Sequence, residues 1–180
     1  MHRRLIPIAA IAVLVLSLTA CVMEFDNAGT IVSGAVKKYS ETVELQDKYQ
    51  TGQPIQLKLE MKMAKAKIGS TGDKLAEAEF EYGSDALKPE FKAEEDRISI
   101  RNTLDKYSFG KIVNDWKVKV TDKVPLEVEL TADASDADID MGGMLLKKMN
   151  AQVNASSMKI DFSEPNKESL DKFRLDADAS

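Results

Sequence analysis

Apolar and polar side chains alternate with a period of two along most of the chain after residue 41, and this pattern constrains the fold most. Successive side chains of a strand point to opposite faces, so the alternation predicts strands with one buried and one solvated face. A helical face needs spacings of three and four, and only residues 145–150 and 167–172 leave room for one. The clearest runs place apolar residues at Ile55, Leu57, Leu59, Met61 and Met63, at Ala76, Ala78, Phe80 and Tyr82, at Trp116, Val118 and Val120, at Leu126, Val128 and Leu130, and at Met158, Ile160 and Phe162.

Prolines mark the ends of these runs. Pro54, Pro89 and Pro125 each precede an alternating stretch, and Pro165 follows one. Proline cannot donate to a sheet ladder, so it is tolerated at the start or end of a strand. The strands are therefore short and numerous, which predicts an all-β domain.

Three segments resemble one another, at residues 64–68, 135–140 and 156–161. Each begins with small residues and continues with an apolar position flanked by charge. The third starts 21 residues after the second, and the pair Ala179 and Ser180 would begin another corner about 24 residues later. Such a period predicts a single-stranded β-solenoid-like stack of short strands, in which each turn buries its face against its neighbours. An ordinary β-sandwich with small-residue turns is the alternative.

The end of this stack raises a question of capping. Stacked coils need terminal caps, and no capping turn is evident at Ser180. The N-terminal strands or pairing with another chain would then supply the cap, or the last turn is incomplete. Self-association through a strand edge is therefore one expectation.

The first 21 residues have the form of a secretion signal. Arg3 and Arg4 precede an apolar run, which ends in the motif Leu18, Thr19, Ala20, Cys21. This motif resembles the lipobox of bacterial lipoproteins, which implies cleavage before Cys21 and attachment of a lipid to its thiol. A membrane-spanning helix is one alternative, although the run is shorter than the roughly 20 residues needed. A secreted protein with a free cysteine is another.

Three segments follow from this reading. A signal-peptide helix occupies residues 1–20, a lipidated N-terminus and tether occupies residues 21–40, and the β domain occupies residues 41–180. An equal alternative is that part of residues 22–40 forms a short first strand or helix. After cleavage the chain keeps 23 basic against 30 acidic side chains, a net charge of −7. This charge disfavours nucleic acid as a partner. The mature chain has no histidine, and its only cysteine carries the lipid, so histidine catalysis and His- or Cys-based metal sites are excluded. We expect no cofactor and no catalytic residue.

Carboxylate side chains are the remaining candidates for a metal site or for catalysis. Calcium takes 6–8 oxygen ligands, and the densest acidic group could supply several. Alternation instead predicts a solvated acidic edge, which we favour over an ion site. Paired acids of a glycosidase would need a cleft, whereas the acids on the strand at residues 75–82 should form a solvated row. The acidic group considered for calcium is Asp133, Asp136, Asp138 and Asp140. The acids expected in the solvated row are Glu77, Glu79 and Glu81.

Four aromatic residues could form an exposed ligand platform: Trp116, Tyr82, Tyr107 and Phe109. Trp116 lies in an alternating strand, so a place in the core is the favoured interpretation.

The ordered series of features along residues 41–180 resembles the N-terminal part of the toast-rack family, bacterial envelope domains of unknown function. The family's usual Gly-Ala-Gly corners are replaced here by Ala-Lys-Ala, Ala-Ser-Asp and Ala-Ser-Ser. The resemblance implies a solenoid-like β fold, a role beside envelope-stress regulators or as an adhesin, and no catalytic residues. It rests on residues 57–63, 75–82, 88–91, 98–100, 115–118, 124–128 and 140–147.

These observations predict a non-enzymatic binding or structural module, adhesin-like and lipid-anchored to a membrane of the bacterial cell envelope on its extracytoplasmic side. The expected partners are membrane lipid through Cys21 and an envelope protein or cell-wall glycan. An accessory or sensor domain of an envelope-stress response is the alternative, and a hydrolase that uses carboxylates alone is a weaker third.

Overall fold

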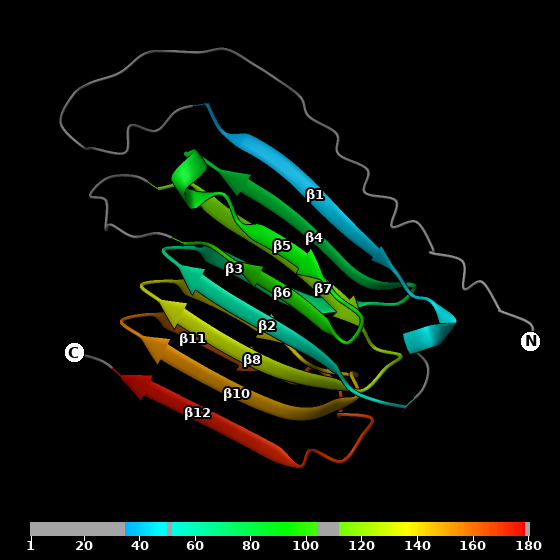
Figure 1. Ribbon diagram of the computed structural model, residues 1–180. Helices are drawn as coiled ribbons and strands as arrows, with labels where there is room; N and C mark the ends of the chain where they lie inside the picture. The colour runs from blue at the N-terminus through cyan, green and yellow to red at the C-terminus, as the bar shows by residue number, and fades with distance from the viewer. Residues whose placement is uncertain (1–34, 50–51, 104–111, 179–180) are drawn as a thin grey trace, which may run out of the picture.

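Two six-stranded β-sheets pack face to face around one hydrophobic core in the computed structural model, which describes residues 35–49, 52–103 and 112–178. Figure 1 shows the strands of both sheets stacked side by side along the molecule. Sheet A has the order β1 (Lys37–Glu44), β4 (Lys74–Tyr82), β7 (Asn114–Thr121), β3 (Lys65–Thr71), β9 (Asp136–Asp140) and β11 (Ser157–Asp161). Sheet B has the order β12 (Lys172–Asp178), β10 (Leu146–Asn154), β8 (Leu126–Asp133), β2 (Ile55–Lys62), β6 (Arg97–Arg101) and β5 (Glu90–Ala93).

The prediction of an all-β domain is confirmed over the described residues. Two short 3-10 turns, η1 (Asp47–Tyr49) and η2 (Asp85–Leu87), are the only helical elements in this part of the chain. Residues 146–150, in the first segment that left room for a helix, belong to β10, and residues 167–171 of the second form a loop that leads into β12. β1 includes the last four residues of the segment assigned to a tether. None of the described residues forms a helix long and apolar enough to span a membrane.

Both sheets are mixed. β1, β4 and β7 pair antiparallel, as do β5 and β6, whereas all other neighbours pair parallel. From β8 onward the chain alternates between the sheets, and β10, β11 and β12 each pair parallel with the strand two elements earlier. A continuous solenoid is not confirmed, because β2 and β3 lie between strands that come later in the sequence.

The alternation decides which side chains form the core. In β2 the residues Ile55, Leu57, Leu59 and Met61 are buried, and the residues between them face outward. Parallel registry aligns these inner positions across sheet B, so that each inner residue extends a column of apolar side chains. One column consists of Ile98, Leu57, Val128 and Met149.

The repeated segments begin just after three corners where the chain passes from sheet B to sheet A. The corner residues Met63, Ala134 and Ala155 have φ angles of 51°, 48° and 45°, a region that costs L-residues about 1–2 kcal/mol. Backbone hydrogen bonds hold the first two corners to the next turn, from Met63 N to Asp133 O (2.9 Å) and from Ala134 N to Asn154 O (3.0 Å). Small residues around the corners let successive turns approach closely.

Candidate functional site

A shallow groove of about 630 Å³ crosses the outer face of sheet A. We call it the sheet A groove. Because outward positions recur at every second residue, each strand supplies two side chains to it. These outward lining residues are Glu79 and Glu81 of β4, Asp115 and Lys117 of β7, Lys65 and Lys67 of β3, Asp136 and Asp138 of β9, and Ser157 and Lys159 of β11.

Strand registry arranges these side chains in two rows across the five strands. Each member of a row is the direct neighbour of the next, so charges from distant parts of the sequence lie side by side. The first row is Glu79, Lys117, Lys67, Asp138 and Lys159, and the second is Glu81, Asp115, Lys65, Asp136 and Ser157.

The charges in the groove are only partly paired. Lys117 Nζ lies 3.4 Å from a Glu79 carboxylate oxygen, and Lys159 Nζ lies 3.9 Å from one of Asp138. Neither Lys65 nor Lys67, both on the central strand β3, makes an ion pair with any described residue. The groove therefore presents two exposed, unpaired ammonium groups within a mixed-charge surface.

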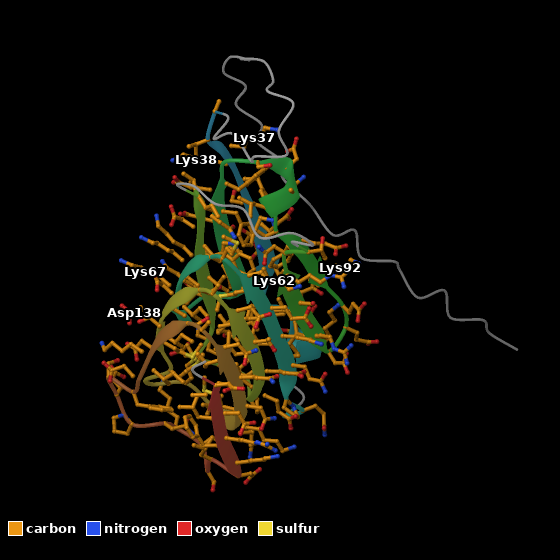
Figure 2. All side chains as sticks on the ribbon, turned by 90° about the vertical axis from the view of Figure 1, so that its left-hand side faces the viewer. Lys37, Lys38, Lys62, Lys67, Lys92 and Asp138 are labelled. Atoms are coloured by element: carbon orange, nitrogen blue, oxygen red, sulfur yellow. The ribbon has the colours of Figure 1, made fainter. Side chains whose placement is uncertain are left out.

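At the β11 rim of the groove, the charge of Lys159 is paired with the carboxylates of Asp161 and Asp138. Lys159 donates a hydrogen bond to the Asp161 carboxylate (3.3 Å), and this contact raises the pKa of Lys159. Figure 2 shows Lys67 and Asp138 projecting from the same side of the molecule, opposite Lys92 of sheet B. The sheet A groove is thus a shallow, charged surface on the outer face of one sheet.

The four aspartates considered for calcium are spread apart. Asp136 and Asp138 line the groove, Asp133 accepts a hydrogen bond from Asn154 Nδ2 (2.8 Å), and Asp140 accepts one from Ser163 Oγ (2.6 Å). In the described part of the chain no group of three or more His, Cys, Asp or Glu side chains could hold a metal ion. Asp136 and Asp138 are exposed, whereas Asp133 and Asp140 are half-buried.

The favoured place of Trp116 in the core is confirmed, and the alternative of an exposed aromatic platform is wrong for its two described members. Trp116 and Tyr82 are buried, and the ring of Trp116 packs edge-on against Phe80 with centroids 5.8 Å apart. Tyr107 and Phe109 lie outside the described residues, as do Leu18, Thr19, Ala20 and Cys21 of the lipobox.

Sequence reasoning identified Glu79 and Glu81 as members of a solvated row but missed the lysines of the groove. The alternation marks Lys65, Lys67 and Lys117 as outward-facing, and that signal was available. Their meeting depends on β3 lying beside β7, which no local pattern reveals.

A family profile described as the N-terminal domain of toast_rack, DUF2154, matches residues 32–174. The match covers most of the chain and confirms the resemblance drawn from the ordered sequence features. No curated protein sequence matches the chain.

Solved structures that resemble this one include two proteins described as adhesion proteins. A candidate cell adhesion protein from Clostridium sporogenes ATCC 15579 aligns with a TM-score of 0.69 at 22% identity, over 79% of this chain and 68% of that chain. A candidate adhesin from Parabacteroides merdae ATCC 43184 aligns with a TM-score of 0.48 at 12% identity, over 81% of this chain and 55% of that chain. The first likeness establishes a shared fold.

Proposed function

This chain belongs to the family of N-terminal toast_rack domains, and from that premise we propose that it is a non-enzymatic, adhesin-like binding module of the bacterial cell envelope. The adhesion role given to the structural relative from Clostridium sporogenes supports this direction. The partner is an envelope protein, and the surface that meets it is the sheet A groove.

The observation that carries the proposal is the pair of unpaired lysines at the centre of the groove. Lys65 lies between Asp115 and Asp136, and Lys67 lies between Lys117 and Asp138, so the face has a definite charge pattern. A complementary pattern on a partner selects register and speeds encounter more than it adds affinity, and each exposed pair contributes about 0.2–1 kcal/mol. Binding should therefore weaken as salt is raised.

A glycan partner is less well supported by this face. Aromatic rings commonly supply the apolar platform for a sugar, and Trp116, the one aromatic residue that lines the groove, is only 1% exposed. A face of mixed charge that extends over five strands suits a protein surface better.

We further propose that the module is anchored by lipid on Cys21, on the extracytoplasmic side of a membrane. The motif formed by Leu18, Thr19, Ala20 and Cys21 supports this placement. Replacement of Cys21 by Ala should move the protein from the membrane fraction to the aqueous fraction. Mass spectrometry of the N-terminal peptide should find a diacylglyceryl group on the parent protein, and an unmodified thiol there would overturn the anchor.

The groove is tested with two charge-matched double variants of the full chain. Lys65→Glu with Lys67→Glu alters the groove, whereas Lys58→Glu with Lys92→Glu makes the same charge change on sheet B. Binding of each purified protein is measured against envelope protein extract and against purified cell-wall glycan. Protease treatment of the extract should abolish binding to it, and the groove variant should weaken that binding, whereas the sheet B variant should not. Binding to glycan that the groove variant leaves unchanged would overturn the proposal, and a membrane regulator as the bound protein would favour the sensor role.

A further inference from the structure

β12 forms one edge of sheet B and carries exposed apolar side chains. β12 pairs parallel with β10 on one side, and no described strand lies on the other, as Figure 1 shows at the red end of the stack. All seven residues of β12 are exposed. Phe173 and Leu175 are exposed at 45% and 50%, although both are large and apolar.

These two side chains stand in core columns. Phe173 aligns with Met149 and Val128, and Leu175 aligns with Ala151 and Leu130, all of which are buried. The exposed apolar side chains thus lie beside a row of backbone N–H and C=O groups with no described strand on that side. An edge of this kind is a template for a further strand.

We infer that β12 pairs antiparallel with β12 of a second copy, about a two-fold axis through Leu175. In that register Lys172 lies opposite Asp178, Phe173 opposite Ala177, Arg174 opposite Asp176, and Leu175 opposite itself. Both basic residues precede the centre and both acidic residues follow it, so the two-fold operation places opposite charges together at four positions. The apolar columns then continue from one copy into the other.

Neighbouring registers lack this complementarity. A shift of the pairing by two residues in one direction places Arg174 opposite Arg174, and a shift in the other places Asp176 opposite Asp176. A shift by one residue would turn the apolar side chains to the outer face. In a parallel, in-register pair each charged residue would lie beside the same residue of the second copy, so every contact would join like charges. Like charges directly opposite one another are destabilising, so the charge order selects a single pairing.

A charge-exchange experiment on the full chain, purified in detergent, tests this pairing. Arg174→Asp makes both positions of each central pair acidic, and Asp176→Arg makes both basic. Each variant alone should self-associate at least about tenfold more weakly than the parent. An equimolar mixture should recover association, because each central pair then joins an acidic side chain of one variant to a basic side chain of the other. Sedimentation velocity measures the masses, and thermal melting checks that both variants are folded.

A covalent test uses the two-fold axis itself. Leu175→Cys should form a disulfide-linked dimer on mild oxidation, whereas Leu170→Cys, outside β12, should give no more dimer than the parent. A parent protein that remains monomeric, or single charge variants that associate as strongly as the parent, would overturn the inference. So would association that the mixture fails to restore. The groove variant with Lys65→Glu and Lys67→Glu should associate normally, which keeps this test separate from the proposed function.

Discussion

Ser135 and Ser156 occupy equivalent places in neighbouring corners of the stack, and the Ser156 hydroxyl accepts a hydrogen bond from the backbone N–H of Ser135 at 2.9 Å. The Ser135 hydroxyl in turn accepts a hydrogen bond from the backbone N–H of Ala64 at 3.1 Å in the preceding corner. These side chains form a ladder that joins three corners whose residues are far apart in sequence. The serines thus supply hydrogen bonds at bends where the ladders of the two sheets are interrupted.

Replacement of Ser135 by Ala should destabilise the fold by about 2 kcal/mol, because the Ala64 N–H loses its acceptor in a buried corner. The lost hydroxyl also donates to the Asp133 carbonyl oxygen at 2.9 Å. Urea denaturation measures the loss. Ser70→Ala, at an exposed position of β3, is the control and should change the free energy of unfolding by less than about 0.5 kcal/mol. Equal effects of the two substitutions would contradict the ladder.

Asn102 extends a sheet ladder by means of its side chain. It is buried just after β6, its Oδ1 accepts from the Lys62 N–H at 2.8 Å, and its Nδ2 donates to the Lys62 carbonyl oxygen at 2.7 Å. Asn102→Ala should cost about 2 kcal/mol in urea denaturation, because the Lys62 N–H loses this acceptor and the Lys62 carbonyl oxygen keeps only the side-chain hydrogen bond from Asn114 Nδ2, at 3.2 Å.

Asn166 provides a matched comparison for Asn102. It makes the same two contacts with Leu146, at 2.9 and 2.8 Å, but is only half-buried. Asn166→Ala should be less destabilising, because water can replace the lost partners. If Asn166→Ala lowers the free energy of unfolding more than Asn102→Ala does, burial does not determine the size of the destabilisation.

The sequence predicts the class of fold and the inner face of each strand, because both depend on local alternation. Leu57, Leu59 and Met61 were expected to point inward, and each is 1% exposed. Residues that lie 21 positions apart in the sequence also contact one another. Lys148 pairs with Glu127 at 2.8 Å, and Lys147 pairs with Glu168 at 3.0 Å. A repeat in sequence becomes a contact when successive turns stack in register.

The strand order could not be read from the same pattern. Alternation says which face a residue occupies and nothing about which strand lies beside it. β2 and β3 are flanked by strands from later in the chain, so Lys65 meets Asp115 on one side and Asp136 on the other. The sheet A groove depends on this order. The sequence also does not predict the role of Asn102, since an isolated asparagine after a strand indicates only a turn.

Gly142 is required by close backbone approach. A Cβ atom at this position would lie 2.4 Å from Glu164 N and 2.7 Å from Ser163 N, in the loop that leads to β12. Gly142→Ala should destabilise the protein by about 2 kcal/mol, because the two backbone segments must separate. Gly69→Ala in β3 is the control, since nothing lies within 4 Å of its Cβ position. That change should be neutral or stabilising by about 0.5 kcal/mol, as measured by urea midpoints. A neutral result for Gly142→Ala would contradict the close approach.

Asp140 ties this same loop to β9 through its charge. Its carboxylate accepts hydrogen bonds from Ser163 Oγ (2.6 Å), Gly142 N (2.9 Å) and Ser163 N (3.1 Å), and these donors lower the pKa of Asp140 from its ordinary value of 3.8. A group whose pKa is lower in the folded state stabilises that state above its unfolded pKa. The contribution is then lost as the pH falls through the lowered value.

Asp140→Asn should therefore reduce the melting temperature at pH 7, and the difference from the parent should shrink as the pH is lowered below about 3.8. Melting curves at a series of pH values from 7 to below 3 measure this difference. Asp138→Asn is the control, because that carboxylate accepts no hydrogen bond from a described residue and faces Lys159 at 3.9 Å. It should change the melting temperature at pH 7 by less. A difference for Asp140→Asn that stays constant or grows toward low pH would show that the contacts of Asp140 do not depend on its charge.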